Sequence, residues 1–181
     1  VGNYAYVTNS NSFASYTDDY VAKINLLTHT IESTIAVHNI AERILAVNNT
    51  LYIGDGFFGE GDGIVRLDLS NGQQTEITLQ QAPNTFQSDG TYLYVLTSDY
   101  VQNYSQLIKI RMSTNEIVAQ IQLGDNTMNA TNLVLADNVL YFNVGKSVYR
   151  YSTELTNLSE GAFITVQTES NFAGYGFNVL N

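Results

Sequence analysis

The sequence contains no cysteine, no tryptophan, a single proline and only seven lysine and arginine residues. Without cysteine it forms no disulfide and no thiolate metal site. Its net charge of −10 argues against nucleic acid as a partner, because phosphates require clustered cations. No run of about 18 apolar residues is present, so we predict no membrane span. The chain shows no signal peptide and does not begin with Met, and we expect that any targeting segment was removed or never included.

A tyrosine returns four times in the same local context, at Tyr6 (AYVT), Tyr52 (LYIG), Tyr94 (LYVL) and Tyr141 (LYFN). The spacings between these signature tyrosines are 46, 42 and 47 residues. A period of this length, with every repeat made of short strands, is typical of a β-propeller. The sequence therefore predicts an all-β protein, a β-propeller of four-stranded antiparallel blades with four repeats in this chain.

Each repeat has a recognisable order of strands. An apolar inner strand comes first, although its pattern is weak in the third repeat, and the signature tyrosine strand follows with apolar residues on both of its faces. The third strand alternates apolar and polar residues and carries one cation, and a fourth strand closes the repeat. The predicted inner strands are 43–47, 85–88 and 132–136, the cations are Lys23, Arg66, Lys109 and Arg150, and the closing strands are 33–37, 75–79, 118–123 and 162–166.

The first repeat lacks an inner strand before Tyr6, and the C-terminus offers one. Residues 176–181 (GFNVLN) placed directly before Val1 give VLNVGNYAYV, which matches ILAVNNTLYI at residues 44–53 without a gap. We therefore expect a single propeller domain over residues 1–181, with repeats at 172–181 plus 1–37, 41–79, 83–123 and 130–166. Three assemblies remain open: a closed four-bladed ring, a homodimer that completes an eight-bladed ring, and a slice of a longer propeller.

The four recurring cations have two interpretations. In the first, each is a polar position on an outer strand that pairs with a neighbouring carboxylate. In the second, the four form a ring that binds an anion. The two histidines, His29 and His38, show neither metal-ligand spacing nor a nucleophile motif, and we expect both to be structural.

The connections between the second and third strands differ most among the repeats, and three of them carry aromatic residues. Variable loops on a repeated scaffold are natural sites of specificity. These aromatic side chains either form a platform for a glycan, peptide or flat cofactor, or pack their loops against their own blades. The candidate ligand-binding residues are Phe13, Tyr16, Phe57, Phe58, Tyr100 and Tyr104.

The segment 54–63 (GDGFFGEGDG) is the candidate metal site. Asp55, Glu60 and Asp62 supply hard oxygen ligands, and the glycines allow backbone carbonyls to turn inward, as a Ca²⁺ loop requires. The spacing does not fit an EF-hand, so a solvated loop is the alternative. At the predicted inner strands, where propeller enzymes gather carboxylates, Glu42 and Asp89 are the nearest candidates.

The residues Tyr6-Val7-Thr8-Asn9 spell the YVTN signature, and the unit that runs through VAKINLLTHTIESTIAV (21–37) resembles the repeat of YVTN-type β-propeller proteins. The later repeats, YIGD, YVLT and YFNV, depart from the literal motif. The resemblance implies the propeller fold and a surface or periplasmic place in a bacterial or archaeal cell, as in surface-layer-like proteins. It implies binding and scaffolding roles, and the motif carries no catalytic residue.

From these observations we expect a noncatalytic binding or scaffold propeller of the bacterial cell envelope, outside the cytoplasm, with a protein, glycan or small molecule as ligand. The alternative is a metal-dependent propeller hydrolase or lyase of the lactonase type. An enzyme of that type requires convergent carboxylates and a cation at the channel mouth, whereas a scaffold requires neither.

Overall fold

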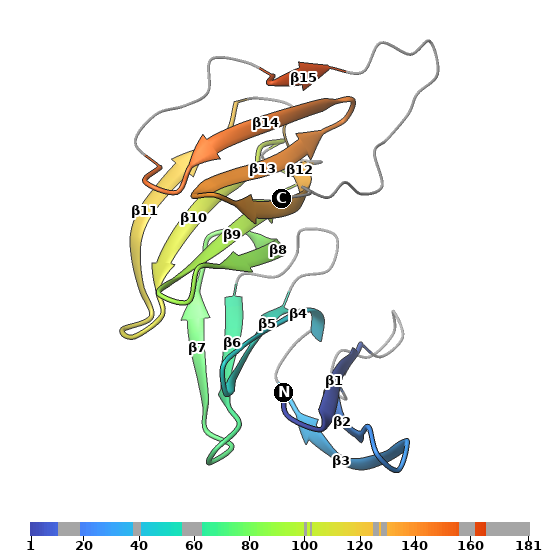
Figure 1. Ribbon diagram of the computed structural model, residues 1–181. Helices are drawn as coiled ribbons and strands as arrows, with labels where there is room; N and C mark the ends of the chain where they lie inside the picture. Colours follow the sequence, from blue (N-terminus) through green and yellow to red (C-terminus); the bar gives the residue numbers. More distant parts are fainter. Residues whose placement is uncertain are drawn as a thin grey trace. The chain divides into compact units, whose positions relative to one another are not determined.

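The computed structural model describes residues 1–10, 19–37, 41–55, 63–99, 101, 103–124, 127, 130–155 and 162–165, and these residues form fifteen β-strands in four antiparallel sheets (Figure 1). Each sheet is called a blade, and the blades are numbered in chain order. Within each blade every strand pairs with the next strand along the chain. This up-and-down order is the one expected for a propeller blade.

The strands lie where the repeat predicts them. Blade 1 comprises β1 (Tyr4–Asn9), β2 (Tyr20–Asn25) and β3 (Thr30–Ala36), and blade 2 comprises β4 (Ala41–Val47), β5 (Thr50–Asp55), β6 (Gly63–Asp68) and β7 (Gln74–Thr78). Blade 3 comprises β8 (Ala82–Ser88), β9 (Tyr92–Ser98), β10 (Gln106–Arg111) and β11 (Glu116–Gln122), and blade 4 comprises β12 (Ala130–Ala136), β13 (Val139–Val144), β14 (Ser147–Ser152) and β15 (Ile164–Thr165). The inner strand of blade 3, indicated only weakly at 85–88, extends over seven residues. The inner strand predicted for blade 1, at 176–181, lies outside the described residues.

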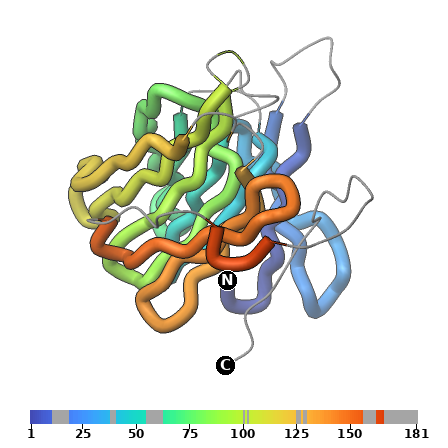
Figure 2. The backbone as a smooth tube through the Cα atoms, turned by 90° about the horizontal axis from the view of Figure 1, so that it is seen from above, coloured from blue at the N-terminus to red at the C-terminus, as the bar shows by residue number. Residues whose placement is uncertain are grey.

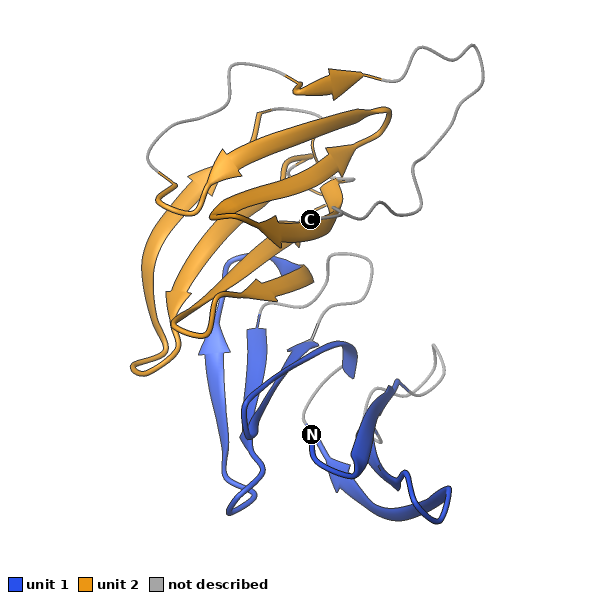
Figure 3. Ribbon diagram, in the orientation of Figure 1, with its two compact units in different colours: residues 1–83 blue, residues 84–181 orange. Residues whose placement is uncertain are grey.

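The chain divides into two compact units, Val1–Pro83 and Asn84–Asn181 (Figure 3). Unit 1 contains blades 1 and 2, and unit 2 contains blades 3 and 4, with the boundary inside β8. In unit 1 the core joins Val21 of blade 1 to Leu51, Ile53, Val65 and Leu67 of blade 2. In unit 2 the core joins the third and fourth blades in the same manner, through Tyr94, Leu96, Leu107, Leu140, Phe142 and Tyr151.

Polar side chains join β8 and β12, the inner strands of the two blades of unit 2; Figure 2 traces the backbone from above. The side-chain amides of Asn84 and Gln87 on β8 donate to the carbonyls of Ala130 and Leu133 on β12, both at 3.0 Å. The backbone N–H of Leu133 donates in return to the Thr85 hydroxyl at 3.2 Å. These polar residues therefore hold neighbouring blades together, which explains why the apolar pattern of β8 is weak.

Within the described ranges, the structure contains no helix with the length and apolar character needed to cross a lipid bilayer.

Candidate functional site

Each signature tyrosine lies directly opposite the recurring cation of its own blade. The antiparallel register pairs Tyr6 with Lys23, Tyr52 with Arg66, Tyr94 with Lys109 and Tyr141 with Arg150. Residues directly opposite in an antiparallel pair project from the same face of the sheet. We call this the Tyr face of a blade and the opposite side its reverse face.

In blades 1 and 3 the cation contacts both an aromatic ring and a carboxylate. The Lys23 ammonium lies 3.9 Å from the ring centroid of Tyr4 and 3.0 Å from a Glu32 carboxylate oxygen. The hydrogen bond from Lys23 lowers the pKa of Glu32. The Lys109 ammonium lies 4.2 Å from the ring centroid of Tyr92 and 4.0 Å from a carboxylate oxygen of Glu154. The predicted pairing of the cation with a neighbouring carboxylate is confirmed at these two positions.

The other two blades use the cation differently. The guanidinium carbon of Arg150 lies 4.3 Å from the ring centroid of Phe163, close to β15. In blade 2 the Nε atom of Arg66 is buried and has no hydrogen-bond partner in the part of the chain that the structure describes. Three of the four cations therefore contact an aromatic ring of their own blade, an interaction worth about 0.5–2 kcal/mol depending on burial.

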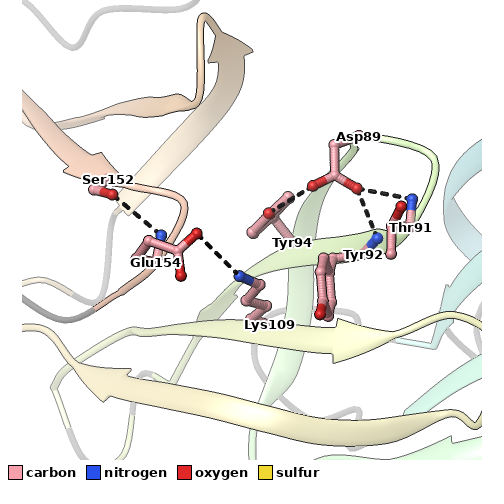
Figure 4. Close-up of polar contacts among 7 residues, drawn as sticks. All are labelled: Asp89, Thr91, Tyr92, Tyr94, Lys109, Ser152 and Glu154. Carbon is pink, nitrogen blue, oxygen red and sulfur yellow. Dashed lines mark hydrogen bonds and ion pairs between the residues drawn. The ribbon is translucent and has the colours of Figure 1, made fainter.

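A cluster of polar contacts in unit 2 includes Lys109 (Figure 4). Lys109 is only 8% exposed, and its counterion Glu154 follows β14 in the next blade, where the Glu154 N–H donates to the Ser152 hydroxyl at 3.2 Å. On the other side, the fully buried Tyr94 donates its phenolic hydrogen to Asp89 at 2.8 Å. The cluster thus spans both blades of the unit.

Asp89 begins the β8–β9 turn and accepts three hydrogen bonds there. The backbone N–H groups of Thr91 and Tyr92 donate to its Oδ1 atom at 2.8 and 2.7 Å, and Tyr94 donates to its Oδ2 atom. Gly90 completes the turn with a φ of 89°, a left-handed conformation that favours glycine. Burial raises the pKa of Asp89, but the three donors outweigh burial and the net shift is downward. Burial, followed by the bond to Asp89, raises the pKa of Tyr94 above its usual range.

The hydrogen bonds of this cluster stabilise the fold. Asp89 remains ionised and Tyr94 remains protonated at neutral pH, because each shift favours the form that makes the hydrogen bond. Asp89, one of the two carboxylates that we considered for catalysis at the inner strands, is thereby used as a turn acceptor. In the described residues no group of three or more His, Cys, Asp or Glu side chains is arranged to hold a metal ion.

In each blade, the loop that joins the signature tyrosine strand to the cation strand lies at one end of the blade, which we call the loop end. In blade 3, Asp99 and Tyr104 form an isolated bridge that closes this loop, and Asp99 Oδ1 accepts the Val101 N–H at 2.8 Å. Val101 is 95% exposed, and Tyr104 is half-buried. The loop therefore presents the apolar side chain of Val101 to solvent and also contains the half-buried Tyr104.

The residue just before the strand that carries the recurring cation anchors the connection to the next blade. This strand is β2 in blade 1 and β10 in blade 3. In blade 1 this residue is Asp19, 3% exposed, whose Oδ2 atom accepts the N–H of Ala41 at 2.8 Å. In blade 3 it is Ser105, whose hydroxyl donates to the carbonyl of Thr127 at 2.6 Å. The backbone carbonyls of Asp19 and Ser105 also accept hydrogen bonds from the N–H groups of Val37 and Leu123. Each of these donors directly follows the closing strand of the same blade, β3 or β11. Burial, with the carboxylate of Asp19 nearby, raises the pKa of half-buried Glu42, although Arg43 opposes the shift.

Most of the predicted site residues lie outside the described residues: Phe13, Tyr16, Phe57, Phe58, Tyr100, Glu60 and Asp62. Tyr104 is described and lies at the loop end. The backbone of Asp55 ends β5 opposite Gly63. His29 lies in the β2–β3 turn with a φ of 56°, and its backbone N–H donates to Asn25. The aromatic platform and the calcium loop therefore stay predictions.

Two groups of residues with defined roles were not predicted from the sequence. Asp19 and Ser105 occupy the same place in the repeat, so alignment of the four third strands would have drawn attention to them. The Tyr94–Asp89 hydrogen bond had a weaker signal, because no other repeat has an acidic residue five positions before its signature tyrosine. A contact that occurs in one repeat only cannot be found from periodicity.

No protein-family model and no curated protein matches the chain. Solved structures do match it, and those named below are β-propeller proteins. Hydrazine synthase of Kuenenia stuttgartiensis matches with a TM-score of 0.71 and 14% identity, over 84% of this chain and 48% of the other. BamB from Moraxella catarrhalis matches with a TM-score of 0.54 and 18% identity, over 80% and 39% of the two chains. The extracellular domain of the one-component system BT4673 from B. thetaiotaomicron matches with a TM-score of 0.61 and 11% identity, over 92% and 24%.

These likenesses and the four meander sheets define the chain as a β-propeller protein. The identities are all too low to carry more than the fold. The chain spans less than half the length of each of these structures. The three include an enzyme by name and an extracellular domain, so they do not select one function.

Proposed function

We propose that this chain is a noncatalytic binding or scaffold module, a β-propeller that presents loop residues to a protein, glycan or small-molecule ligand. The division of roles within blade 3 carries the proposal. Lys109, Asp89 and Tyr94 are engaged in contacts inside the scaffold, whereas the loop end displays Val101 at 95% exposure in the same loop as half-buried Tyr104. Aromatic residues are enriched at protein contact surfaces, and an exposed apolar residue in the same loop adds to such a surface.

The proposed surface extends over the equivalent loops of the other repeats. Phe13 and Tyr16 belong to the loop of the first repeat, Phe57 and Phe58 to that of the second, and Tyr100 to the loop that contains Tyr104. Aromatic rings offer large, rigid faces to sugars and peptides at a small cost in conformational entropy. The proposed ligand is therefore one with a flat or apolar face.

The proposed location is outside the cytoplasm, in the envelope of a bacterial cell, as part of a single propeller domain over residues 1–181. Two observations support this location. The YVTN signature at Tyr6–Asn9 resembles repeats of surface and periplasmic propellers, and one of the matched structures is an extracellular domain.

The test is a screen of the 181-residue chain on a glycan array and a peptide array, followed by variants of the loop end. Tyr104→Ala and Val101→Ser are expected to weaken binding of any hit at least about tenfold, the effect of losing a central contact residue. Leu27→Ser is the matched control, because Leu27 is 75% exposed but lies in the β2–β3 turn, away from the connections between second and third strands. Equal binding by all three variants would contradict the proposal.

The second candidate is a metal-dependent hydrolase or lyase, favoured by the carboxylates of segment 54–63. Asp55, at the end of β5, is the proposed ligand together with Glu60 and Asp62, and Ca²⁺ is the proposed ion. Calorimetric titration with Ca²⁺ tests the metal site on which the second candidate depends. Binding that is lost in Asp62→Asn but retained in Asp99→Asn would support the metal site, and no heat of binding in the wild type would remove it.

A further inference from the structure

The side chain of Arg150 has no acceptor among the described residues. The cation of blade 3, Lys109, is paired with Glu154, and the exposed Arg111 on β10 donates to Glu116 at 2.9 Å. Arg150 is exposed as well, but within the described ranges its guanidinium forms neither an ion pair nor a hydrogen bond. A guanidinium carries five N–H donors, so those of Arg150 are open to a ligand.

Phe163 restrains this guanidinium. The guanidinium carbon of Arg150 lies 4.3 Å from the ring centroid of Phe163. The backbone N–H of Phe163 donates to the carbonyl of Val148 at 2.7 Å, which holds the residue just before β15 against β14. A guanidinium that stacks on a ring uses its flat face, and its N–H groups remain available at the edge. The contact with Phe163 therefore preorganises the donors of Arg150 without using them.

Tyr141 and Val148 extend the surface around Arg150. Tyr141 lies directly opposite Arg150 in the β13–β14 register, and its ring centroid is 6.2 Å from that of Phe163, with the two rings inclined at 57°. Val148 lies two residues before Arg150 on the same strand and hence on the same Tyr face. Tyr141 and Val148 are half-buried, and Phe163 is 45% exposed. We call these four residues the blade 4 patch, and all of them belong to unit 2.

The chemistry of the blade 4 patch fits a carboxylate that is attached to a ring. A guanidinium matches a carboxylate with two parallel hydrogen bonds. The rings of Tyr141 and Phe163 offer flat apolar area to the body that carries the acid group. A flexible acidic side chain of a peptide would reach Arg150 and leave this area uncovered. The net charge of −10 disfavours ligands with many negative charges, so one carboxylate per ligand is expected.

We propose that the blade 4 patch binds a monocarboxylate whose acid group is attached to a ring. Arg150 pairs with the carboxylate, and Phe163 and Tyr141 contact the ring. Two sources share this chemistry, a uronic acid of a glycan and a free aromatic acid, and the experiment distinguishes them.

The proposed site is distinct from the ring of four cations considered in the sequence. Lys23 and Lys109 are paired with carboxylates inside the scaffold, and Arg150 keeps its scaffold contact with Phe163 through the face of the guanidinium. The blade 4 patch includes no residue of the loop-end surface around Tyr104. The inference is therefore independent of the loop-borne ligand proposed above.

The experiment is an NMR titration of the isotopically labelled chain with two acids and their uncharged twins. The pairs are methyl glucuronide with methyl glucoside, and phenylacetate with phenylacetamide. At least one acid is expected to shift the Nε–H signal of Arg150 and the backbone N–H signal of Phe163, and to bind at least about tenfold more tightly than its twin, because hydrogen bonds between two charged groups are the stronger ones. The acid that does so identifies the source. The proposal is overturned if neither acid exceeds its twin or if the shifted signals lie elsewhere.

Three variants test the residues of the patch. Arg150→Gln is expected to weaken binding of the acid at least about tenfold and to abolish its advantage over the uncharged twin, and Phe163→Leu is expected to weaken both. Arg43→Gln is the matched control, because Arg43 on β4 is an exposed arginine of the other unit and should leave binding unchanged. Unchanged affinity in Arg150→Gln, or an equal loss in Arg43→Gln, would overturn the site. Circular dichroism verifies the fold, and the comparison of acid with twin on the wild type remains decisive if Arg150→Gln fails to fold.

Discussion

The ammonium nitrogen of Lys109 lies 4.2 Å from the ring centroid of Tyr92, two residues before the signature tyrosine of blade 3. Blade 1 repeats the arrangement with Lys23 over Tyr4 at 3.9 Å. Blades 2 and 4 have Thr50 and Val139 at the equivalent position, and in blade 4 Arg150 lies over Phe163 instead, with its guanidinium carbon 4.3 Å from the ring centroid. In three of the four blades the cation therefore recurs together with an aromatic ring of its own blade, which favours a scaffold role for it over an anion ligand.

Replacement of Tyr94 by Phe removes one buried hydrogen bond. The hydroxyl donates to Asp89 at 2.8 Å and the ring is fully buried, so Tyr94→Phe is expected to lower the free energy of unfolding by about 1–2 kcal/mol. Tyr141→Phe is the matched control, because the residue five positions before Tyr141 is Ala136. Urea unfolding followed by circular dichroism measures both. Equal losses in the two variants would contradict a specific role for Asp89.

The contribution of Asp89 is expected to depend on pH. Its folded-state pKa is lowered, so its stabilisation is present above the ordinary pKa of aspartate and is lost as the pH falls through the lowered value. Because Asp89 is exposed, the difference between wild type and Asp89→Asn is expected to be about 0.5–1 kcal/mol at neutral pH and to shrink as the pH falls below the ordinary pKa of aspartate. Urea midpoints measured across this range test the sign. A stability difference between wild type and Asp89→Asn that grows on acidification would contradict this prediction.

Glu42 is expected to behave in the opposite way. Burial and the neighbouring Asp19 raise its folded-state pKa, so its ionisation destabilises the fold as the pH rises through that value. Glu42→Gln should therefore raise stability at neutral pH, by no more than about 1 kcal/mol for a half-exposed group, and should leave it unchanged at about pH 4 and below. Glu76→Gln, on the exposed side of β7, is the control and should change stability by less than about 0.5 kcal/mol at either pH. A loss of stability in Glu42→Gln at neutral pH would contradict this.

Periodicity was enough to predict the strands, because each repeat must present apolar residues at period two to bury a blade between two neighbours. The four signature tyrosines and four cations lie in the predicted strands, opposite one another. The weak pattern of β8 has a physical cause in Asn84, Thr85 and Gln87, which use hydrogen bonds in place of apolar packing to contact β12.

The candidate site was less predictable, since function lies where the repeats differ. Asp19 looks like any loop aspartate in the sequence, and only the position of the Ala41 N–H shows that it is a buried acceptor. Asp89 was considered as a channel carboxylate, but it accepts hydrogen bonds from its own turn and from Tyr94. Periodicity could not predict these contacts, because only the third repeat has an acidic residue at this position. Tyr104 was selected by its aromatic character, whereas the high exposure of Val101 in the same loop was not predicted.

The central claim is that the recurring cation is part of the scaffold, and the free energy of unfolding of two Lys109 variants tests it most directly. Lys109→Ala removes the buried stem that packs against Tyr92 and should cost about 2 kcal/mol or more. Lys109→Met keeps most of that volume and should remain within about 1 kcal/mol of the wild type, because the lost ring and Glu154 contacts are offset by the relief of burying a charge. Wild-type stability in Lys109→Ala would contradict the claim and would return the four cations to the role of a ligand site.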